Sequence, residues 1–308
     1  MLRSHILRRR FENLESRLAL AGNVAASFGE VLQLRGDEAA NIVQITQESG
    51  GSVLVQGLND TKINGRASAR FNGSGLEKVD IKMFGGGDQL TVRNLRVTTD
   101  MNIEMGRGND VVSLIGTRSG VVTTVKMDDG TDRVSASGVR TGSDFNIETG
   151  QGNSNVSVSN STIEGTLRVI GLDGTDTVTV ANASVGKDLQ INTGKGNDAV
   201  TLRDVTATLT AIVITDLGDD RVTAVRVRTG EDFNVETGEG NDNVALTDLT
   251  SSKNIKVDVQ TGSDRVAVTR VRAAKDAVFL GGDGFDTFDN NGVTDGEKLE
   301  IKEFDRFI

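Results

Sequence analysis

The sequence predicts an all-β fold, a parallel β-helix (a β-solenoid) built from ten coils of 22 residues each. The first observation is a glycine that recurs every 22 residues, from Gly86 to Gly284. The second is an aspartate two residues after nine of these ten glycines, and the third is a Leu, Val or Phe two residues further on. A period of this length, held without insertion, is typical of a solenoid, in which each repeat packs mainly on its neighbours. Crossover chirality favours a right-handed coil.

We number the coils 1 to 10 from Gly86 to Gly284 and refer to the ten positions after these glycines as the aspartate column. Its members are Asp88, Asp110, Asp132, Ser154, Asp176, Asp198, Asp220, Asp242, Asp264 and Asp286. The serine of coil 4 is therefore the single departure from the pattern.

Composition limits the class of partner. The 308 residues carry a net charge of -10 and include 37 Gly but no Cys, Pro, Trp or Tyr. Without cysteine there can be no disulfide. Because phosphate contacts need clustered Lys and Arg, the acidity disfavours nucleic acid as a partner. No segment has the roughly 18 apolar residues of a membrane span.

Residues 1–26 differ from the rest and are predicted to be a poorly ordered leader or sorting segment. The start is basic, but the following stretch is too often interrupted by polar residues for a secretory signal. The run from Phe11 to Leu20 resembles the LEPR-XLL segment of planctomycete extracellular proteins. Leu14, Glu15, Arg17 and Leu20 match that segment, while Ser16 replaces its proline. The resemblance implies export, so we expect an extracellular or cell-surface protein.

Residues 27–84 are predicted to form a cap. Short apolar runs near residues 31–34, 42–45 and 53–55 indicate strands, and Gly50-Gly51 between the last two indicates a hairpin. An open first coil would recruit other chains, so a β-meander at this end is most simply a cap. Residues 85–308 are then the parallel β-helix.

Each coil contains two predicted strands. Counted from the aspartate column, positions +2 and +4 are apolar, as in Val112 and Leu114, and so are +13 and +15, as in Phe145 and Ile147. Such alternation indicates strands with one buried face. Position +7, as in Leu95, adds a third inward contact.

A 44-residue period lies on top of the 22-residue one. Alternate coils carry a second glycine four residues before the column: Gly106, Gly150, Gly194, Gly238 and Gly282. Three of the intervening coils instead place an arginine directly after the aspartate, namely Arg133, Arg221 and Arg265. We expect these arginines to neutralise their aspartates.

The glycine-rich turns resemble the nonapeptide repeat of hemolysin-type (RTX) proteins, and Gly281 to Asp289 matches its consensus. In that family the turns bind Ca²⁺ through carboxylate and carbonyl oxygens. The resemblance implies a calcium site at the positions Asp110, Asp198, Asp242, Asp286, Gly106, Gly108, Gly194, Gly196, Gly238, Gly240, Gly282 and Gly284. The motif occurs once per 22 residues here, whereas the family repeats it about every nine. The alternative is a structural ladder, in which each aspartate accepts hydrogen bonds from its own turn.

Arginine and aspartate also recur four residues apart at another corner, as in Arg96 and Asp100 or Arg140 and Asp144, and we expect a row of surface ion pairs there. A β-helix enzyme would break its repeat to assemble acids, bases and aromatic residues in a groove. This repeat is almost unbroken and the only histidine is His5. We therefore expect a non-enzymatic, extracellular, self-associating structural solenoid stabilised by calcium. The alternative is an adhesin or a module that binds cell-surface polysaccharide.

Overall fold

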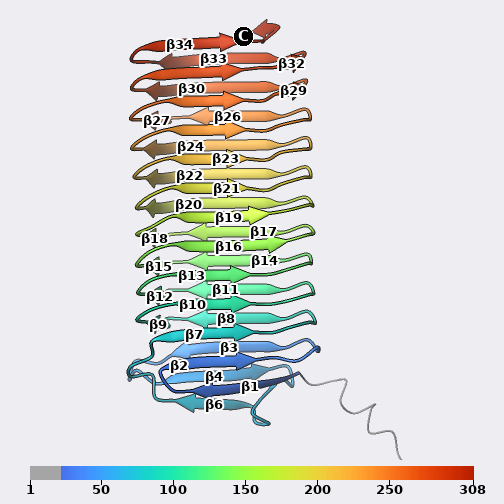
Figure 1. Cartoon of the computed structure of the whole chain (residues 1–308), viewed down its shortest axis with the longest axis vertical. Coiled ribbons are helices and arrows are strands. Elements are labelled where there is room, and N and C mark those ends of the chain that lie inside the picture. Colours follow the sequence, from blue (N-terminus) through green and yellow to red (C-terminus); the bar gives the residue numbers. More distant parts are fainter. Residues whose placement is uncertain (1–21) are drawn as a thin grey trace, which may run out of the picture.

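The computed structural model describes residues 22–308, in which strands stack into one long rod (Figure 1). The predicted parallel β-solenoid of ten 22-residue coils is confirmed; its right-handedness stays a prediction. Residues 22–308 contain no helix that could cross a lipid bilayer. The leader's residues 1–21, with the LEPR-XLL-like run, lie outside the described residues.

The first strand of each coil lies in a 19-stranded sheet, and the second lies in a 14-stranded sheet. The first strands are β8 (Gln89–Arg93), β11 (Val111–Ile115), β14 (Arg133–Ser137), β17 (Asn155–Ser159), β20 (Thr177–Val185), β22 (Ala199–Ala207), β24 (Arg221–Thr229), β26 (Asn243–Thr247), β30 (Arg265–Ala273) and β33 (Thr287–Thr294). The second strands are β10 (Met101–Glu104), β13 (Thr123–Lys126), β16 (Phe145–Gly150), β19 (Leu167–Gly171), β21 (Leu189–Asn192), β23 (Ala211–Ile214), β25 (Phe233–Glu236), β28 (Ile255–Asp258), β31 (Asp276–Leu280) and β34 (Lys298–Lys302). Strand β7 (Lys78–Lys82) precedes coil 1 and pairs in parallel with β10.

Equivalent residues of successive coils are paired in parallel register, so each buried position forms a column along the rod. Val112 pairs with Val134, and Val134 pairs with Val156. The predicted inward positions +2, +4, +13 and +15 are buried in coils 1 to 9, where Val112, Leu114, Phe145 and Ile147 are all 0% exposed. In coil 10 only position +2, Phe288, is buried. The core is one continuous cluster from Val24 to Phe288.

The third inward contact belongs to a short arm. Leu95 and its equivalents at +7 are buried, as predicted, and the residue at +9 is buried too. Five coils form a separate two-residue strand here: β9 (Arg96–Val97), β12 (Arg118–Ser119), β15 (Arg140–Thr141), β18 (Thr162–Ile163) and β27 (Thr250–Ser251). In coils 5, 6, 7 and 9 this arm is continuous with the nine-residue strands β20, β22, β24 and β30.

The N-terminal cap adds antiparallel strands to the ends of both sheets. Its strands are β1 (Asn23–Phe28), β2 (Val31–Arg35), β3 (Ile42–Gln47), β4 (Val53–Leu58), β5 (Lys62–Ile63) and β6 (Ser68–Phe71). The predicted hairpin is β3–β4, in which Gln47 faces Val53. Parallel pairing of β2 with β7 and of β3 with β8 joins this cap to coil 1. Strand β1 begins at Asn23, inside the segment assigned to the leader.

Phenylalanine closes both ends of the core. At the C-terminal end, Phe288 lies 5.0 Å from Phe279 and 5.1 Å from Phe304, measured between ring centroids. At the N-terminal end, the rings of Phe28 and Phe71 stack 5.3 Å apart. Beyond coil 10 the chain continues into β35 (Arg306–Phe307), which pairs with β33. Two further short strands, β29 (Thr261–Gly262) and β32 (Asp283–Gly284), pair with one another at the turns.

Stacking of the turns explains the glycine periods. A Cβ atom on Gly196 would overlap the backbone carbonyl oxygen of Gly174, one coil earlier, and its φ of +142° disfavours any L side chain. Along this column, a Cβ on each of the glycines from Gly108 to Gly284 would overlap the carbonyl of the glycine one coil earlier. The additional glycines follow the same rule every second coil, because a Cβ on Gly194 would overlap the carbonyl of Leu172. Both periods are therefore required by coil-to-coil contact.

We predict that Gly196→Ala destabilises the rod by at least about 1–3 kcal/mol, because the substitution forces a side chain into a disfavoured backbone conformation and into the neighbouring coil. Gly50→Ala is the matched control, since an added Cβ there meets nothing within 4 Å. Thermal unfolding followed by circular dichroism measures both. Equal melting temperatures for the two variants would contradict this account of the turns.

Candidate functional site: a buried aspartate column

The aspartate column lies inside the rod. Each of its nine aspartates is at most 2% exposed, and Ser154 is 5% exposed. Each side chain points inward because the following strand alternates, so that Asp132 and Val134 face the core while Arg133 between them faces solvent. The column is therefore a row of carboxyl groups in an otherwise mostly apolar interior.

One carboxylate oxygen of each aspartate links two coils. The backbone N–H of Asp88 donates to Oδ1 of Asp110 at 2.6 Å, and the N–H of Asp110 donates to Oδ1 of Asp132 at 2.8 Å. The same bond recurs from Ser154 to coil 10, at 2.7–2.8 Å. The structural ladder considered from the sequence is therefore present. Its hydrogen bonds come from the preceding coil, however, and not from the aspartate's own turn.

Both ends of this ladder are completed by residues outside the repeat. At the N-terminal end, the N–H of Asn41, in the cap, donates to Oδ1 of Asp88 at 2.6 Å. At the C-terminal end, the N–H of Asp286 donates to Oδ2 of Asp305 at 2.9 Å. The cap and the terminal segment thus continue the bonding of the regular coils.

An outer ladder of opposite direction accompanies the inner one. The side chain just before the column accepts a hydrogen bond from the next coil, as when the N–H of Thr131 donates to Oδ1 of Asn109 at 2.9 Å. Asn153, Asn197, Asp219 and Asn241 accept equivalent bonds at 2.7–3.0 Å. Two adjacent side chains therefore fasten each of these turns to both neighbouring coils, except in coil 4, where Ser154 replaces the aspartate.

The second carboxylate oxygen has no such partner. Oδ2 is buried without a hydrogen bond in eight of the nine aspartates, Asp176 being the exception. Because burial disfavours the charged form, it raises the pKa of these groups against the opposing effect of the backbone N–H. The pKa rises to about 7 for Asp88, Asp132, Asp220 and Asp264 and to about 6 for Asp110 and Asp176.

Burial also raises the pKa of Asp198, Asp242 and Asp286. For Asp198 and Asp242 the rise is opposed by the hydroxyls of Thr193 and Thr237, five residues earlier in the same coils. These hydroxyls are themselves buried and make no hydrogen bond of standard geometry. In coils 2 and 3 the position of these threonines, five residues before the aspartate, is occupied by Met105 and Met127. The side chain at this position is therefore polar in some coils and apolar in others.

Two expectations about counter-charges are wrong. Arg133, Arg221 and Arg265 are exposed, on the opposite face of the strand from their aspartates, and do not contribute to the pKa of Asp132, Asp220 or Asp264. The pairs of the other corner, such as Arg96 with Asp100, are not among the ion pairs of residues 22–308. Their aspartates bond to the backbone instead. The N–H of Thr166, for example, donates to Oδ1 of Asp144 at 2.9 Å.

Arg265 and Asp289 form an ion pair between coils 9 and 10 across 24 positions, and the other ion pairs between coils join residues 22 positions apart. They are Lys82–Glu104, Lys126–Glu148, Asp204–Arg226, Glu231–Lys253 and Asp248–Arg270. Arg226 meets Asp204 through two nitrogen atoms, at 2.5 and 2.7 Å. These contacts add surface links between stacked coils.

The predicted calcium positions hold coils together. All eight glycines have positive φ, and Asp110, Asp198, Asp242 and Asp286 are column members whose Oδ1 atoms are occupied by backbone N–H groups. Nearby turn carbonyls are also used, since Phe84 accepts from Arg107. Among the described residues, no three Asp, Glu or His side chains gather as metal ligands. Calcium binding at these turns stays a prediction.

The substitution in coil 4 leaves a gap in the ladder. Ser154 is too short to reach the preceding coil, and the N–H of Asp132 has no acceptor among the described residues. Oγ of Ser154 is buried without a partner. The register of β16, in coil 3, with β19, in coil 4, shifts just before Gly152, between Glu148 and Gly150. The one sequence irregularity therefore marks a local irregularity of the stack.

We predict that the rod is more stable near pH 5 than near pH 8, the reverse of common acid denaturation. Since the folded-state pKa of the column aspartates lies above the unfolded value of about 3.8, the native state binds protons more tightly. Their contribution is complete below about pH 4 and is lost as the pH rises to about 7. One pKa unit corresponds to about 1.4 kcal/mol, so a melting temperature higher by several degrees is expected.

Asp220 provides a pair of variants for this test. Asp220→Asn keeps an oxygen for the N–H of Asp198 and removes the titration, so it should flatten the pH dependence. Asp220→Ala removes the acceptor and should destabilise the rod at both pH values by about 1–3 kcal/mol. Greater stability of the wild type at pH 8 than at pH 5 would overturn the assignment.

No protein-family model, curated protein or solved structure matches this chain. The geometry of the column and of the rod surface is therefore the basis for assigning a function.

Proposed function

We propose that this chain is a non-enzymatic structural solenoid of the cell surface or extracellular space, acting as a rod that associates with copies of itself. One observation carries the proposal: the invariant residues of the repeat fasten coil to coil. The column glycines allow the turns to stack, and the column aspartates accept the N–H groups of the preceding coil. A repeat maintained for stacking suits a load-bearing rod.

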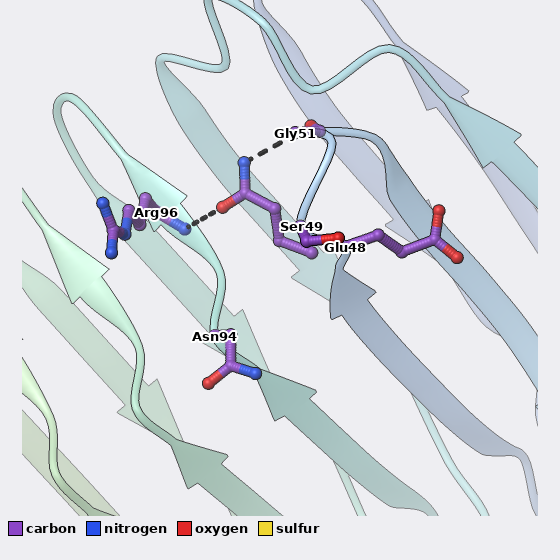
Figure 2. A pocket seen from close by; sticks show the side chains of 6 residues that line it. Glu48, Ser49, Gly51, Asn94 and Arg96 are labelled. Carbon is purple, nitrogen blue, oxygen red and sulfur yellow. Dashed lines mark hydrogen bonds between the residues drawn. The ribbon is translucent and has the colours of Figure 1, made fainter.

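The surface hollows support the non-enzymatic part of the proposal. A hollow of about 420 Å³ between the cap and coil 1 is lined by Gln47, Glu48, Ser49, Gly51, Asn94 and Arg96 (Figure 2). Its single carboxylate, that of Glu48, already bonds to Ser52 and to Arg70. The aspartates with raised pKa lie in the interior and do not line this hollow. One of them, Asp132, borders a second hollow of about 340 Å³, but this residue is only 2% exposed. An acid–base site would place such groups within reach of a substrate.

The outer face of the 14-stranded sheet supports lateral self-association. Along most of the rod this face carries charged or amide side chains, but Ile170, Ile212 and Ile214 line a hollow of about 260 Å³ in coils 4 to 6. Leu172 beside them is 51% exposed. Because both rod ends are closed by hairpins or phenylalanines, contact between copies is expected along this side.

We predict concentration-dependent oligomers of the wild type by analytical ultracentrifugation and laterally paired rods by electron microscopy. We refer to Ile170, Leu172, Ile212 and Ile214 as the apolar patch. Ile214→Lys should abolish the oligomers, because it places a charge in this patch. Asn102→Lys, on the same face in coil 1, is the control and should leave assembly intact. A strictly monomeric wild type at all concentrations would contradict self-association.

The calcium prediction has its own test. Because every column aspartate already accepts a backbone N–H through Oδ1 without a cation, we expect strand content and melting temperature to be retained in excess EDTA. A loss of structure in EDTA that Ca²⁺ restores, and that is absent from the Asp198→Asn and Asp242→Asn variants, would establish the calcium role instead. Circular dichroism with and without each additive distinguishes the outcomes.

The polysaccharide-binding alternative needs a surface that departs from the regular repeat. Coils 1 to 3 carry such a surface, a row of exposed arginines without ion pairs.

A further inference from the structure

Three arginines form a column on the short arm of the first three coils, and we refer to Arg96, Arg118 and Arg140 as the arginine stripe. Arg118 is the register partner of both Arg96 and Arg140. Since neighbouring strands lie about 4.8 Å apart, three positive charges are stacked directly over one another. All three side chains are exposed, and like charges in this arrangement repel.

The stripe is not neutralised by neighbouring acids. None of its arginines is among the ion pairs of residues 22–308, and residues 93–99, 115–121 and 137–143 contain four Arg but no Asp or Glu. Asp100 and Asp144 lie just beyond the stripe and accept backbone N–H groups of the next coil. A protein with a net charge of -10 thus keeps one strongly basic surface.

In later coils, the basic residues near this corner are paired with acids or are not stacked on one another. At the same corner, Arg226 pairs with Asp204, Arg270 with Asp248 and Lys253 with Glu231. In the arginine column itself, Arg228 and Arg272 are separated by Thr250 and are not stacked on one another. A single arginine is compensated by an acidic partner or by solvent ions. The three stacked arginines, which have no ion-pair partner among residues 22–308, repel one another and leave positive charge to be compensated.

The surroundings of the stripe are open. Glycines flank Arg118 at 116 and 120 and flank Arg140 at 138 and 142, so no large side chain covers either guanidinium. At its N-terminal end the stripe continues into the polar hollow of about 420 Å³ beside the cap. There the N–H of Arg96 donates to Oε1 of Gln47 at 3.0 Å, and Figure 2 shows the guanidinium of Arg96 directed away from the Glu48 carboxylate.

We propose that the arginine stripe and the adjoining hollow bind a linear acidic polysaccharide that lies along the rod axis. Carboxylates repeating along the glycan face Arg96, Arg118 and Arg140, and each guanidinium can bind one of them through two hydrogen bonds. Gln47, Ser49 and Asn94 in the hollow offer donors and acceptors for the hydroxyl groups of one sugar.

A glycan fits this surface better than a nucleic acid. Nucleic-acid sites combine a large basic area with aromatic side chains for base stacking. The basic area here is one column wide, the chain has no Trp or Tyr, and its net charge of -10 would repel a dense polyphosphate. A single-stranded polymer with one carboxylate per sugar has a lower linear charge density than a nucleic-acid duplex and meets less of that repulsion.

The test uses the full chain and polygalacturonate as the probe, with neutral dextran and single-stranded DNA as comparisons. We expect binding of polygalacturonate at low salt that weakens as salt rises, and no binding of dextran. Arg118→Gln with Arg140→Gln should lower the affinity by roughly tenfold or more. The matched control is Arg228→Gln with Arg272→Gln, which removes the same charge from the same column in coils 7 and 9 and should leave the affinity unchanged.

Three results would overturn the proposal: no binding of polygalacturonate by the wild type, an equal loss of affinity in both double variants, or tighter binding of DNA than of polygalacturonate. All four substituted arginines are exposed, so unchanged melting temperatures will show that the variants are folded. Binding is measured on the soluble rod by isothermal titration calorimetry, which separates it from self-association through the apolar patch.

Discussion

The hydrogen bond from one coil's backbone N–H to the next coil's aspartate Oδ1 is the constraint on which the rest of this rod depends. It requires the carboxyl group to point inward at every turn, and it requires the two turns to approach closely. Close approach in turn demands glycine two residues before the column, because a Cβ on any glycine from Gly108 to Gly284 would overlap the preceding coil. Burial of the carboxyl then raises its pKa. The stacked architecture, the glycine pattern and the raised pKa of the column aspartates are thus consequences of one contact.

The coil period, the two strand arms, the inward positions and the capping hairpin could all be predicted from the sequence, because periodicity reports directly on burial and stacking. The partners of the polar residues could not. Spacing within the chain suggested Arg133 beside Asp132 and Arg96 beside Asp100, yet bonding in a solenoid runs between residues 22 apart. The sequence did contain a signal for these ion pairs, in residues of opposite charge spaced 22 positions apart. At one corner the series Asp204, Arg226, Asp248 and Arg270 alternates in charge from coil to coil.

The surface indicates candidate contacts with partners where its residues depart from the repeat. The interior is nearly uniform along the rod, whereas the outer faces carry an apolar patch around Ile212 and an arginine stripe on coils 1 to 3. A contact between copies and a contact with an acidic glycan would use different sides and different chemistry. The separate positions of the apolar patch and the arginine stripe would allow one rod to pair with a copy of itself and to hold a polysaccharide. Neither contact would disturb the buried aspartate column that keeps the coils together.

Infrared spectroscopy with isotope-labelled aspartate tests the central claim most directly, because protonated and ionised carboxyl groups absorb at different frequencies. The account predicts that several aspartates remain protonated near pH 6 and ionise only as the pH passes about 7, and that Asp220→Asn removes part of this signal. Complete ionisation of every aspartate by about pH 5 in the folded protein would contradict a buried carboxyl column.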